Sequence, residues 1–252
     1  MDISEADYFF IDLEGTLIKW NDTIIGAEEL VHTLREKGKT VYFHTDNSLL
    51  SRSGFAHKLQ NMGIDAKEDE IITSAYSAAR YLERKNVREV YAIGERGLIQ
   101  ELSNKGISTS RECENVLIGL DRQFNYSKLK DAAEIAESGN VYVCSDEKQV
   151  YAEKFFPHQL AINNAVETFA ESSLLGKPSN PFIDALREKT FVPDKTVFIG
   201  DRMSDVETGK KLGVKTALVM SGETTRSDLM RLEDSEKPDF GVSNLTKLTG
   251  RL

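Results

Sequence analysis

The 252-residue sequence has few cysteines, no excess of basic residues and no long apolar run. Its two cysteines, Cys113 and Cys144, provide neither a disulfide framework nor the spacing of a zinc site, so we expect buried, reduced thiols. No apolar stretch approaches the roughly 18 residues of a membrane-spanning helix. The net charge of −9 argues against nucleic acid or an anionic membrane surface as a partner. We expect a cytoplasmic protein, because no secretory leader precedes the first predicted strand.

Internal repeats, low-complexity tracts and glycine-rich linkers are also absent, so composition marks no domain boundary. Several amphipathic segments instead end in a glycine just before an apolar run, at Gly38, Gly139 and Gly213. Glycine closes the last turn of a helix in the left-handed conformation. Helices that alternate with strands predict an α/β fold with a doubly wound parallel, Rossmann-like core sheet.

The first apolar run, residues 8–17, stops at Asp12 and turns at Gly15, with Glu14 between them. Ligands of open α/β sheets bind outside the carboxyl ends of the strands, where such a run delivers its carboxylate. Taken alone, an aspartate before a glycine turn is more often a turn former. The segment gains weight because other strand ends in the chain carry similar groups.

Three further segments follow this pattern. The run 40–45 ends in hydroxyl and amide groups, a lysine stands between a glycine and a proline, and the run 196–200 precedes two acids four residues apart. Each is ordinary by itself, since lysines are usually solvated and acids often open helices. Their common order in one chain makes coincidence a poor explanation. The residues concerned are Thr45, Asp46, Asn47, Lys177, Asp201 and Asp205.

With Asp12, this ordered set resembles the four motifs of the haloacid dehalogenase (HAD) superfamily of phosphatases. Segments 91–98, 116–121 and 176–182 are similar to the NagD-like, 4-nitrophenylphosphatase branch. The resemblance covers nearly the whole chain. It implies a phosphatase that hydrolyses small phosphate monoesters, such as 4-nitrophenyl phosphate or a sugar phosphate, and whose partner is a small phosphorylated metabolite. Dimerisation through a cap domain follows from the resemblance alone.

The resemblance also assigns chemistry to the acids. Asp12 would attack phosphorus and form an aspartyl-phosphate, and Glu14 would act as general acid and base. Mg²⁺ would be held by the Asp12 side chain, the Glu14 carbonyl and the Asp201 side chain, a donor set that suits a hard cation. Asp205 would act from outside this first set, on the metal waters or on Lys177.

Substrate binding is expected at the second and third motifs. Thr45 and the backbone amides beside it would hold phosphoryl oxygens, with Asp46 and Asn47 in the same binding set. Lys177 would neutralise charge on the phosphate and on the nucleophile. The preceding His44 should point away from the site if Thr45 faces it, because side chains alternate along a strand, so we expect His44 to have a packing role.

Two departures from the family pattern leave alternatives open. Glu14 stands where family phosphatases carry aspartate. In the middle of the chain, segment 145–148 replaces the Asn-Pro-Asp-like or Asp-x-Asp segment of relatives, and segment 156–160 lacks both glycines of their Pro-Gly-x-Gly turn. One alternative is therefore a catalytically weakened or inactive HAD-fold protein that binds a phosphometabolite. Another is an enzyme that passes the phosphoryl group to an acceptor other than water.

The domain organisation follows from the spacing of the motifs. More than 130 residues separate Thr45 from Lys177, too many for the few βα units between neighbouring strands. We therefore expect an inserted α/β cap domain over residues 83–171. Residues 1–82 and 172–252 would form the catalytic core.

Overall fold

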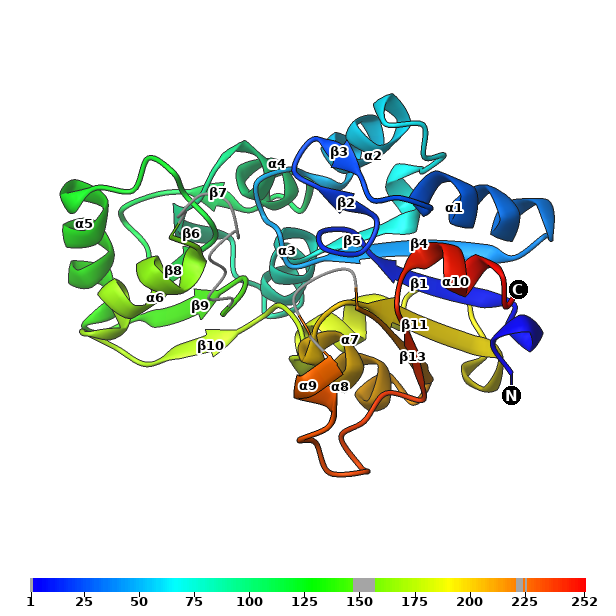
Figure 1. Ribbon diagram of the computed structural model, residues 1–252. Helices are drawn as coiled ribbons and strands as arrows, with labels where there is room; N and C mark the ends of the chain where they lie inside the picture. Colours follow the sequence, from blue (N-terminus) through cyan, green and yellow to red (C-terminus); the bar gives the residue numbers. More distant parts are fainter. Residues whose placement is uncertain (1, 147–156, 221–223, 225) are drawn as a thin grey trace. The chain divides into compact units, whose positions relative to one another are not determined.

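The computed structural model describes residues 2–146, 157–220, 224 and 226–252 (Figure 1). Residues 147–156 lie outside this description, and with them residues 147, 148 and 156 of the two cap-loop segments noted in the sequence. Within the described parts of the chain, no helix is both long enough and apolar enough to cross a bilayer.

The chain divides into two compact units. The first comprises Met1–Thr45, Phe55–Ile72 and Leu186–Leu252, and the second comprises Asp46–Gly54 and Thr73–Ala185. The second unit is larger than the predicted cap of residues 83–171, because it also takes in 46–54, 73–82 and 172–185. The assignment of core and cap roles to these parts stays a prediction.

A six-stranded sheet forms the centre of the first unit, in the order β13-β12-β11-β1-β4-β5. Strand β1 pairs in parallel with β11 and β4, and β12 pairs in parallel with β11 and β13. A short hairpin, β2 with β3, follows β1. The strands are β1 (Tyr8–Asp12), β2 (Ile18–Lys19), β3 (Asp22–Thr23), β4 (Thr40–Thr45), β5 (Ile71–Thr73), β11 (Thr196–Gly200), β12 (Lys215–Val219) and β13 (Phe240–Val242).

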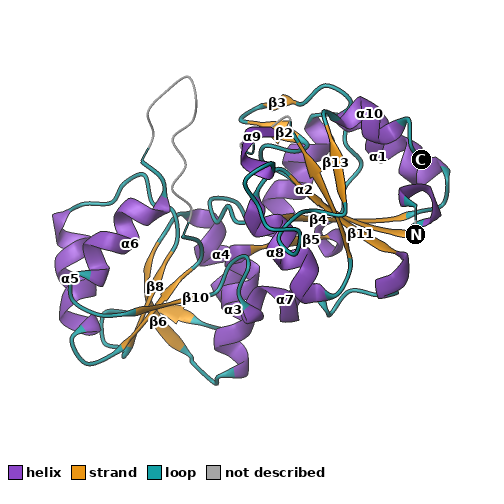
Figure 2. Cartoon of the chain, turned by 60° about the horizontal axis from the view of Figure 1, so that its bottom comes forward, coloured by secondary structure: helices purple, strands orange, loops and turns teal. Residues whose placement is uncertain are grey.

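Helices flank this sheet, and α1, α2 and α8 bury apolar residues. Helix α1 packs against β4 and α10, burying Leu30, Val31 and Leu34 at helical spacing, and α8 packs against β11 and β12. Figure 2 shows helices along both faces. The helices are α1 (Ala27–Glu36), α2 (Arg52–Asn61), α8 (Met203–Leu212), α9 (Arg226–Leu229) and α10 (Leu245–Thr249), with 3₁₀ turns at Ile3–Glu5, Glu68–Glu70 and Pro193–Lys195.

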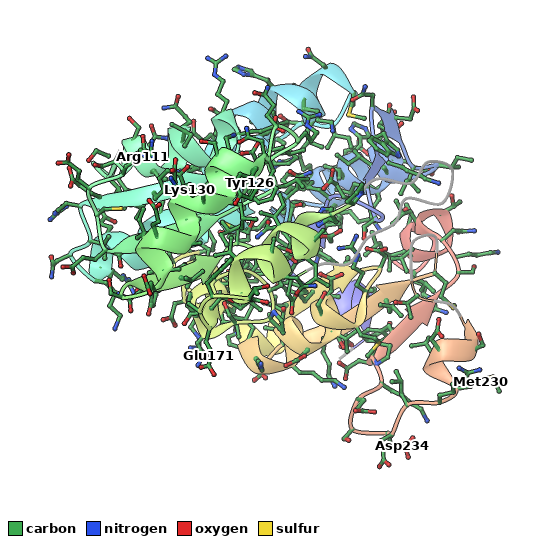
Figure 3. All side chains as sticks on the ribbon, turned by 90° about the vertical axis from the view of Figure 1, so that its left-hand side faces the viewer. Arg111, Tyr126, Lys130, Glu171, Met230 and Asp234 are labelled. Carbon is green, nitrogen blue, oxygen red and sulfur yellow. The ribbon has the colours of Figure 1, made fainter. Side chains whose placement is uncertain are left out.

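The second unit is built on a five-stranded sheet in the order β10-β9-β8-β6-β7. One apolar cluster joins this sheet to α3 and α4, and another joins it to α5 and α6, so helices cover both faces. Tyr126 and Lys130 lie on the outer side of α5 (Figure 3). The elements are α3 (Ser74–Arg84), β6 (Glu89–Ile93), α4 (Arg96–Asn104), β7 (Ser108–Thr109), β8 (Asn115–Ile118), α5 (Tyr126–Ala136), β9 (Asn140–Val143), α6 (Gln159–Glu167), β10 (Ser172–Leu174) and α7 (Asn180–Leu186).

The predicted α/β fold with a doubly wound parallel sheet is confirmed. Gly38 and Gly213 have φ angles of 70° and 82°, as expected for glycines that close helices. The same prediction is wrong for Gly139, which lies outside the left-handed region. Glycine is needed there for a different reason, because a Cβ would lie 2.4 Å from the carbonyl oxygen of Glu114.

Both cysteines are free thiols, as predicted. Cys144 is buried, whereas Cys113 is partly exposed, so the expectation of burial is correct for one of the two. Burial raises the pKa of the Cys144 thiol well above its usual range, and the charge of Asp46 adds to the effect. Cys144 is therefore a packing residue and a poor nucleophile.

Replacing Gly213 with alanine should lower the free energy of unfolding by about 1 kcal/mol, because a Cβ is disfavoured in the left-handed conformation. A Cβ there would meet nothing within 4 Å, so the loss comes from the backbone alone. Gly241 in β13 has equal room and lies outside the left-handed range, which makes Gly241→Ala the matched control. Equal losses for the two variants in chemical denaturation would contradict this account.

Candidate active site

The loop after β1 brings an acid of the fourth motif against the first motif. Gly15 has a φ of 91°, and a Cβ on it would lie 2.4 Å from a carboxylate oxygen of Asp201. The Thr16 hydroxyl lies 3.5 Å from the other oxygen of that carboxylate. Glycine at position 15 thus serves both the turn and the close approach of Asp201.

Asp205 is placed by the start of α8. Its carboxylate accepts a hydrogen bond of 3.1 Å from the backbone N–H of Arg202, an arrangement typical of helix N-termini. It also lies directly over Gly200, where a Cβ would come within 2.2 Å of the carboxylate. The last position of β11 therefore has to be glycine if Asp205 is to keep this place.

Asp12, His44 and Asp205 form one buried group. Their ligand atoms lie within 4.8 Å of one another, and His44 Nδ1 is 3.5 Å from Asp12 Oδ1. All three side chains are almost fully shielded from solvent. Two ionised carboxylates at this separation repel each other strongly away from water, and a cation bound between them would offset that repulsion. Carboxylate and imidazole atoms in this arrangement can hold a divalent metal ion.

His44 differs from the sequence expectation in one respect. Its ring stacks on Phe198 at 4.1 Å between centroids, so the predicted packing role is confirmed. Its predicted direction away from the site is wrong, because His44 pairs with Asp12 in the parallel register and both side chains lie on one face. Strands β1 and β4 end at Asp12 and Thr45, so matching their ends would pair these two residues. In the sheet, the register is shifted by one residue, and Asp12 pairs with His44.

Lys177 and Asp46 form a buried pair in the second unit. Asp46 Oδ1 accepts a hydrogen bond of 2.8 Å from the Lys177 backbone N–H, and Lys177 Nζ lies 3.6 Å from Asp46 Oδ2. The Ser74 hydroxyl donates to the Asp46 carbonyl at 2.6 Å. Both the side chain and the main-chain carbonyl of Asp46 are thus held by hydrogen bonds. A buried lysine is tolerated when a carboxylate compensates its charge, as here.

The other two predicted substrate residues, Thr45 and Asn47, are also buried. Thr45 is the last residue of β4, and Asn47 Oδ1 accepts a hydrogen bond of 2.8 Å from the backbone N–H of Leu49, which shapes the turn after the strand. The first unit contains Asp12, Glu14, Thr45, Asp201 and Asp205; the second contains Asp46, Asn47 and Lys177.

Comparison with known proteins places the chain in a family. A model for haloacid dehalogenase-like hydrolases matches residues 9–108, and a second, HAD-hydrolase-like model matches residues 174–248. An acid sugar phosphatase of Staphylococcus aureus is 31% identical, with 97% of both chains aligned. Phosphoglycolate phosphatase 1A of Arabidopsis thaliana is 30% identical over 97% of this chain and 76% of its own.

A solved structure agrees with these relatives. The 4-nitrophenylphosphatase of Thermotoga maritima superimposes with a TM-score of 0.89 and 31% identity, covering 98% of each chain. The chain therefore belongs to the haloacid dehalogenase-like hydrolases. Within that family it is a phosphatase of the branch that contains the NagD and 4-nitrophenylphosphatase proteins.

Replacing Gly200 with alanine should weaken divalent-metal binding by roughly tenfold or more, because the added Cβ must push the Asp205 carboxylate out of its group. Isothermal titration with Mg²⁺ and with Mn²⁺ measures the effect. Gly241→Ala, which adds a Cβ into open space, is the control and should bind metal as the native chain does. Native affinity in the Gly200 variant would show that Asp205 has no part in metal binding.

Proposed function

We propose that the protein hydrolyses small phosphate monoesters with Mg²⁺ and through an aspartyl-phosphate at Asp12. The observation that carries the proposal is the buried group of Asp12, His44 and Asp205 at the carboxyl ends of β1, β4 and β11, in a chain of a phosphatase family. The names of the relatives support the substrate class, since they include sugar phosphatases and a 4-nitrophenylphosphatase.

Asp12 would be the nucleophile. It ends β1, its side chain is buried, and the backbone N–H of the next residue donates to the carbonyl of His44, which fixes the direction in which the chain leaves the sheet. A carboxylate held this rigidly is suited to in-line attack on phosphorus. Covalent attack divides a slow hydrolysis into two easier steps, formation and breakdown of the aspartyl-phosphate.

The acidic donor set fits Mg²⁺, with the Asp12 side chain, the Glu14 carbonyl and the Asp201 side chain as the proposed ligands. When bound, the ion would neutralise charge between a carboxylate and a phosphate dianion. The close approach of Asp201 to Gly15 supports its part in this set. Asp205, which accepts a hydrogen bond at the N-terminus of α8, would not bind the ion directly but would orient its ligands.

Phosphate binding is proposed for Thr45, Asn47 and Lys177, together with the backbone amides that follow β4. Asp46 was predicted in the same set, and its contacts indicate how it would contribute, namely by holding the Lys177 backbone and ammonium group. Glu14 would protonate the leaving oxygen and later activate water. Cytoplasmic location and dimerisation through the predicted cap stay predictions.

The alternative of an inactive phosphometabolite-binding protein rests on Glu14 and the altered cap loop. It is not favoured, because relatives that span nearly the whole chain carry phosphatase names. Glu14 nevertheless bears on the rate, since a side chain one methylene longer than aspartate must still place its proton within about 0.5 Å.

Asp12→Asn should reduce phosphate release from 4-nitrophenyl phosphate by at least about 10³-fold, because an amide cannot attack phosphorus. A panel of small phosphomonoesters, assayed with Mg²⁺ and with EDTA, measures the loss. Asp7→Asn is a matched control in the same unit, since Asp7 pairs only with surface Lys39 and Lys195 among the described contacts. Metal-independent release, or release that survives Asp12→Asn, would overturn the proposed mechanism.

Glu14→Asp should raise kcat by about tenfold, part of the 10²- to 10⁴-fold that general acid–base catalysis supplies, because aspartate matches the family geometry. Steady-state kinetics with 4-nitrophenyl phosphate test this, and Glu36→Asp on the exposed side of α1 controls for the change of length. A fall in kcat would mean that the loop after β1 is adapted to glutamate.

A further inference from the structure

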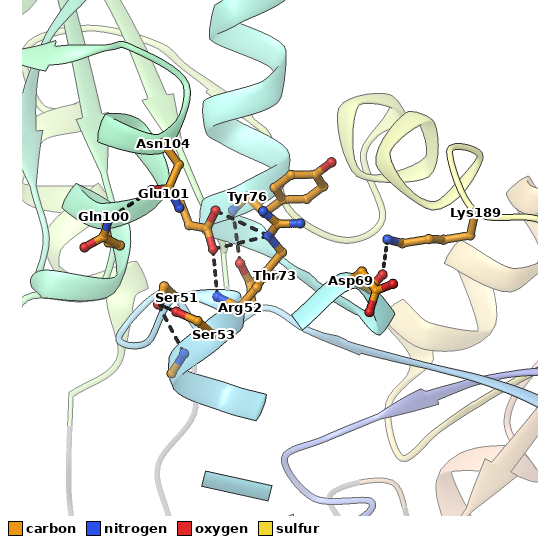
Figure 4. A network of polar contacts seen from close by, with 11 residues as sticks. Ser51, Arg52, Ser53, Asp69, Thr73, Tyr76, Gln100, Glu101, Asn104 and Lys189 are labelled. Carbon is orange, nitrogen blue, oxygen red and sulfur yellow. Dashed lines mark hydrogen bonds and ion pairs between the residues drawn. The ribbon is translucent and has the colours of Figure 1, made fainter. Parts of the chain in front are cut away.

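We infer that Glu101, on α4, is a positioning residue for phosphate binding, and that it acts through the segment 46–54 that follows β4. The inference rests on the proposed function, since it assigns a role in the same phosphate-binding turn. Glu101 is completely buried, and its carboxylate is directed at Arg52 (Figure 4). No motif in the sequence singles it out.

Glu101 holds the first turn of α2 from outside the helix. Its Oε1 accepts a hydrogen bond of 2.7 Å from the backbone N–H of Arg52, and both carboxylate oxygens lie 3.4 Å from Arg52 Nε. The Arg52 guanidinium lies 4.0 Å above the ring of Tyr76 on α3. The Glu101 carboxylate therefore holds both the main chain and the side chain of Arg52, and the Tyr76 ring makes a second contact with that side chain.

The residues just after Asn47 are held in the same way. Ser48 Oγ accepts a hydrogen bond of 2.9 Å from the backbone N–H of Leu120, and the Leu49 carbonyl accepts one of 3.1 Å from Gly97. Together with Glu101, these contacts tie three positions of a seven-residue stretch, 46–52, to α4 and to the loop after β8. The turn carrying Asp46 and Asn47 is thus fixed at its far end.

Two glycines allow this close attachment. A Cβ on Gly97 would lie 2.3 Å from the backbone of Leu50, and a Cβ on Gly119 would lie 2.7 Å from Ser48 Oγ. Real Cβ atoms do not approach so closely, so the segment fits only because both positions lack a side chain. Packing of main chain on main chain leaves little freedom for the turn to shift.

Through these contacts, Glu101 would affect phosphate binding. Phosphate held by backbone amides needs those amides in place to within about 0.5 Å. Loss of the Glu101 carboxylate frees the start of α2 and, through it, the turn at Asp46 and Asn47. Since the turn would hold the phosphoryl group in both ground and transition states, the effect should fall mainly on KM and on inhibition by inorganic phosphate.

The test compares full-length Glu101→Ala, Glu101→Gln and Ser48→Ala with the native chain. Glu101→Ala should raise KM for 4-nitrophenyl phosphate and the Ki of inorganic phosphate together by roughly tenfold, with a smaller change in kcat. Glu101→Gln keeps an oxygen for the Arg52 N–H and should recover part of the loss. Ser48→Ala removes a separate anchor of the same turn and should act in the same direction, even if Glu101→Ala folds poorly.

Asp131→Asn is the matched control, because Asp131 is also a buried carboxylate of the second unit, paired with Arg111 and Tyr91. It should lower the melting temperature without moving the Ki of phosphate. Unchanged KM and Ki in the Glu101 and Ser48 variants, or equal shifts in Asp131→Asn, would overturn the inference. The proposed function would still stand if the native chain hydrolyses the substrate. A native chain that neither releases nor binds phosphate overturns both.

Discussion

The crowding of Asp12 and Asp205 around His44 is the constraint on which the first unit depends. Their ligand atoms lie within 4.8 Å of one another and away from solvent, where like charges repel most strongly. The backbone beside these acids lacks side chains where they approach it. Gly15 leaves room for Asp201, and Gly200 leaves room for Asp205. Such an arrangement is unfavourable for stability, and a cation bound by the group could offset that cost.

The second unit contains a buried positive charge, which is compensated by a carboxylate. Lys177 is buried, and Asp46 holds both its backbone and its ammonium group. The turn that carries Asp46 continues into a segment anchored by Ser48 and by Glu101. The lysine and the backbone turn proposed to bind phosphate are therefore both held by buried contacts, which limit how far the turn can move.

Much of this could be anticipated from local pattern. Apolar runs ending in acids or hydroxyls identified the strands and the polar residues at their carboxyl ends, and the alternation of helices and strands predicted the parallel sheets. The failures concern relations between elements. The helix-end pattern predicts a left-handed turn at Gly139, but glycine is required there because a Cβ would collide with the Glu114 carbonyl. His44 was expected to face away from Asp12, because the register between two strands is not encoded in either strand alone.

The sequence by itself determined the α/β class, the order of the motifs and the residue types available for phosphate chemistry, because these depend on periodicity and on spacing along one chain. Only the tertiary structure decided that His44 joins Asp12 and Asp205, that Asp46 pairs with Lys177, and that Glu101 accepts a hydrogen bond from the Arg52 backbone at the start of α2. These contacts join residues far apart in the chain. Their geometry follows from strand register and close packing, which no local pattern specifies.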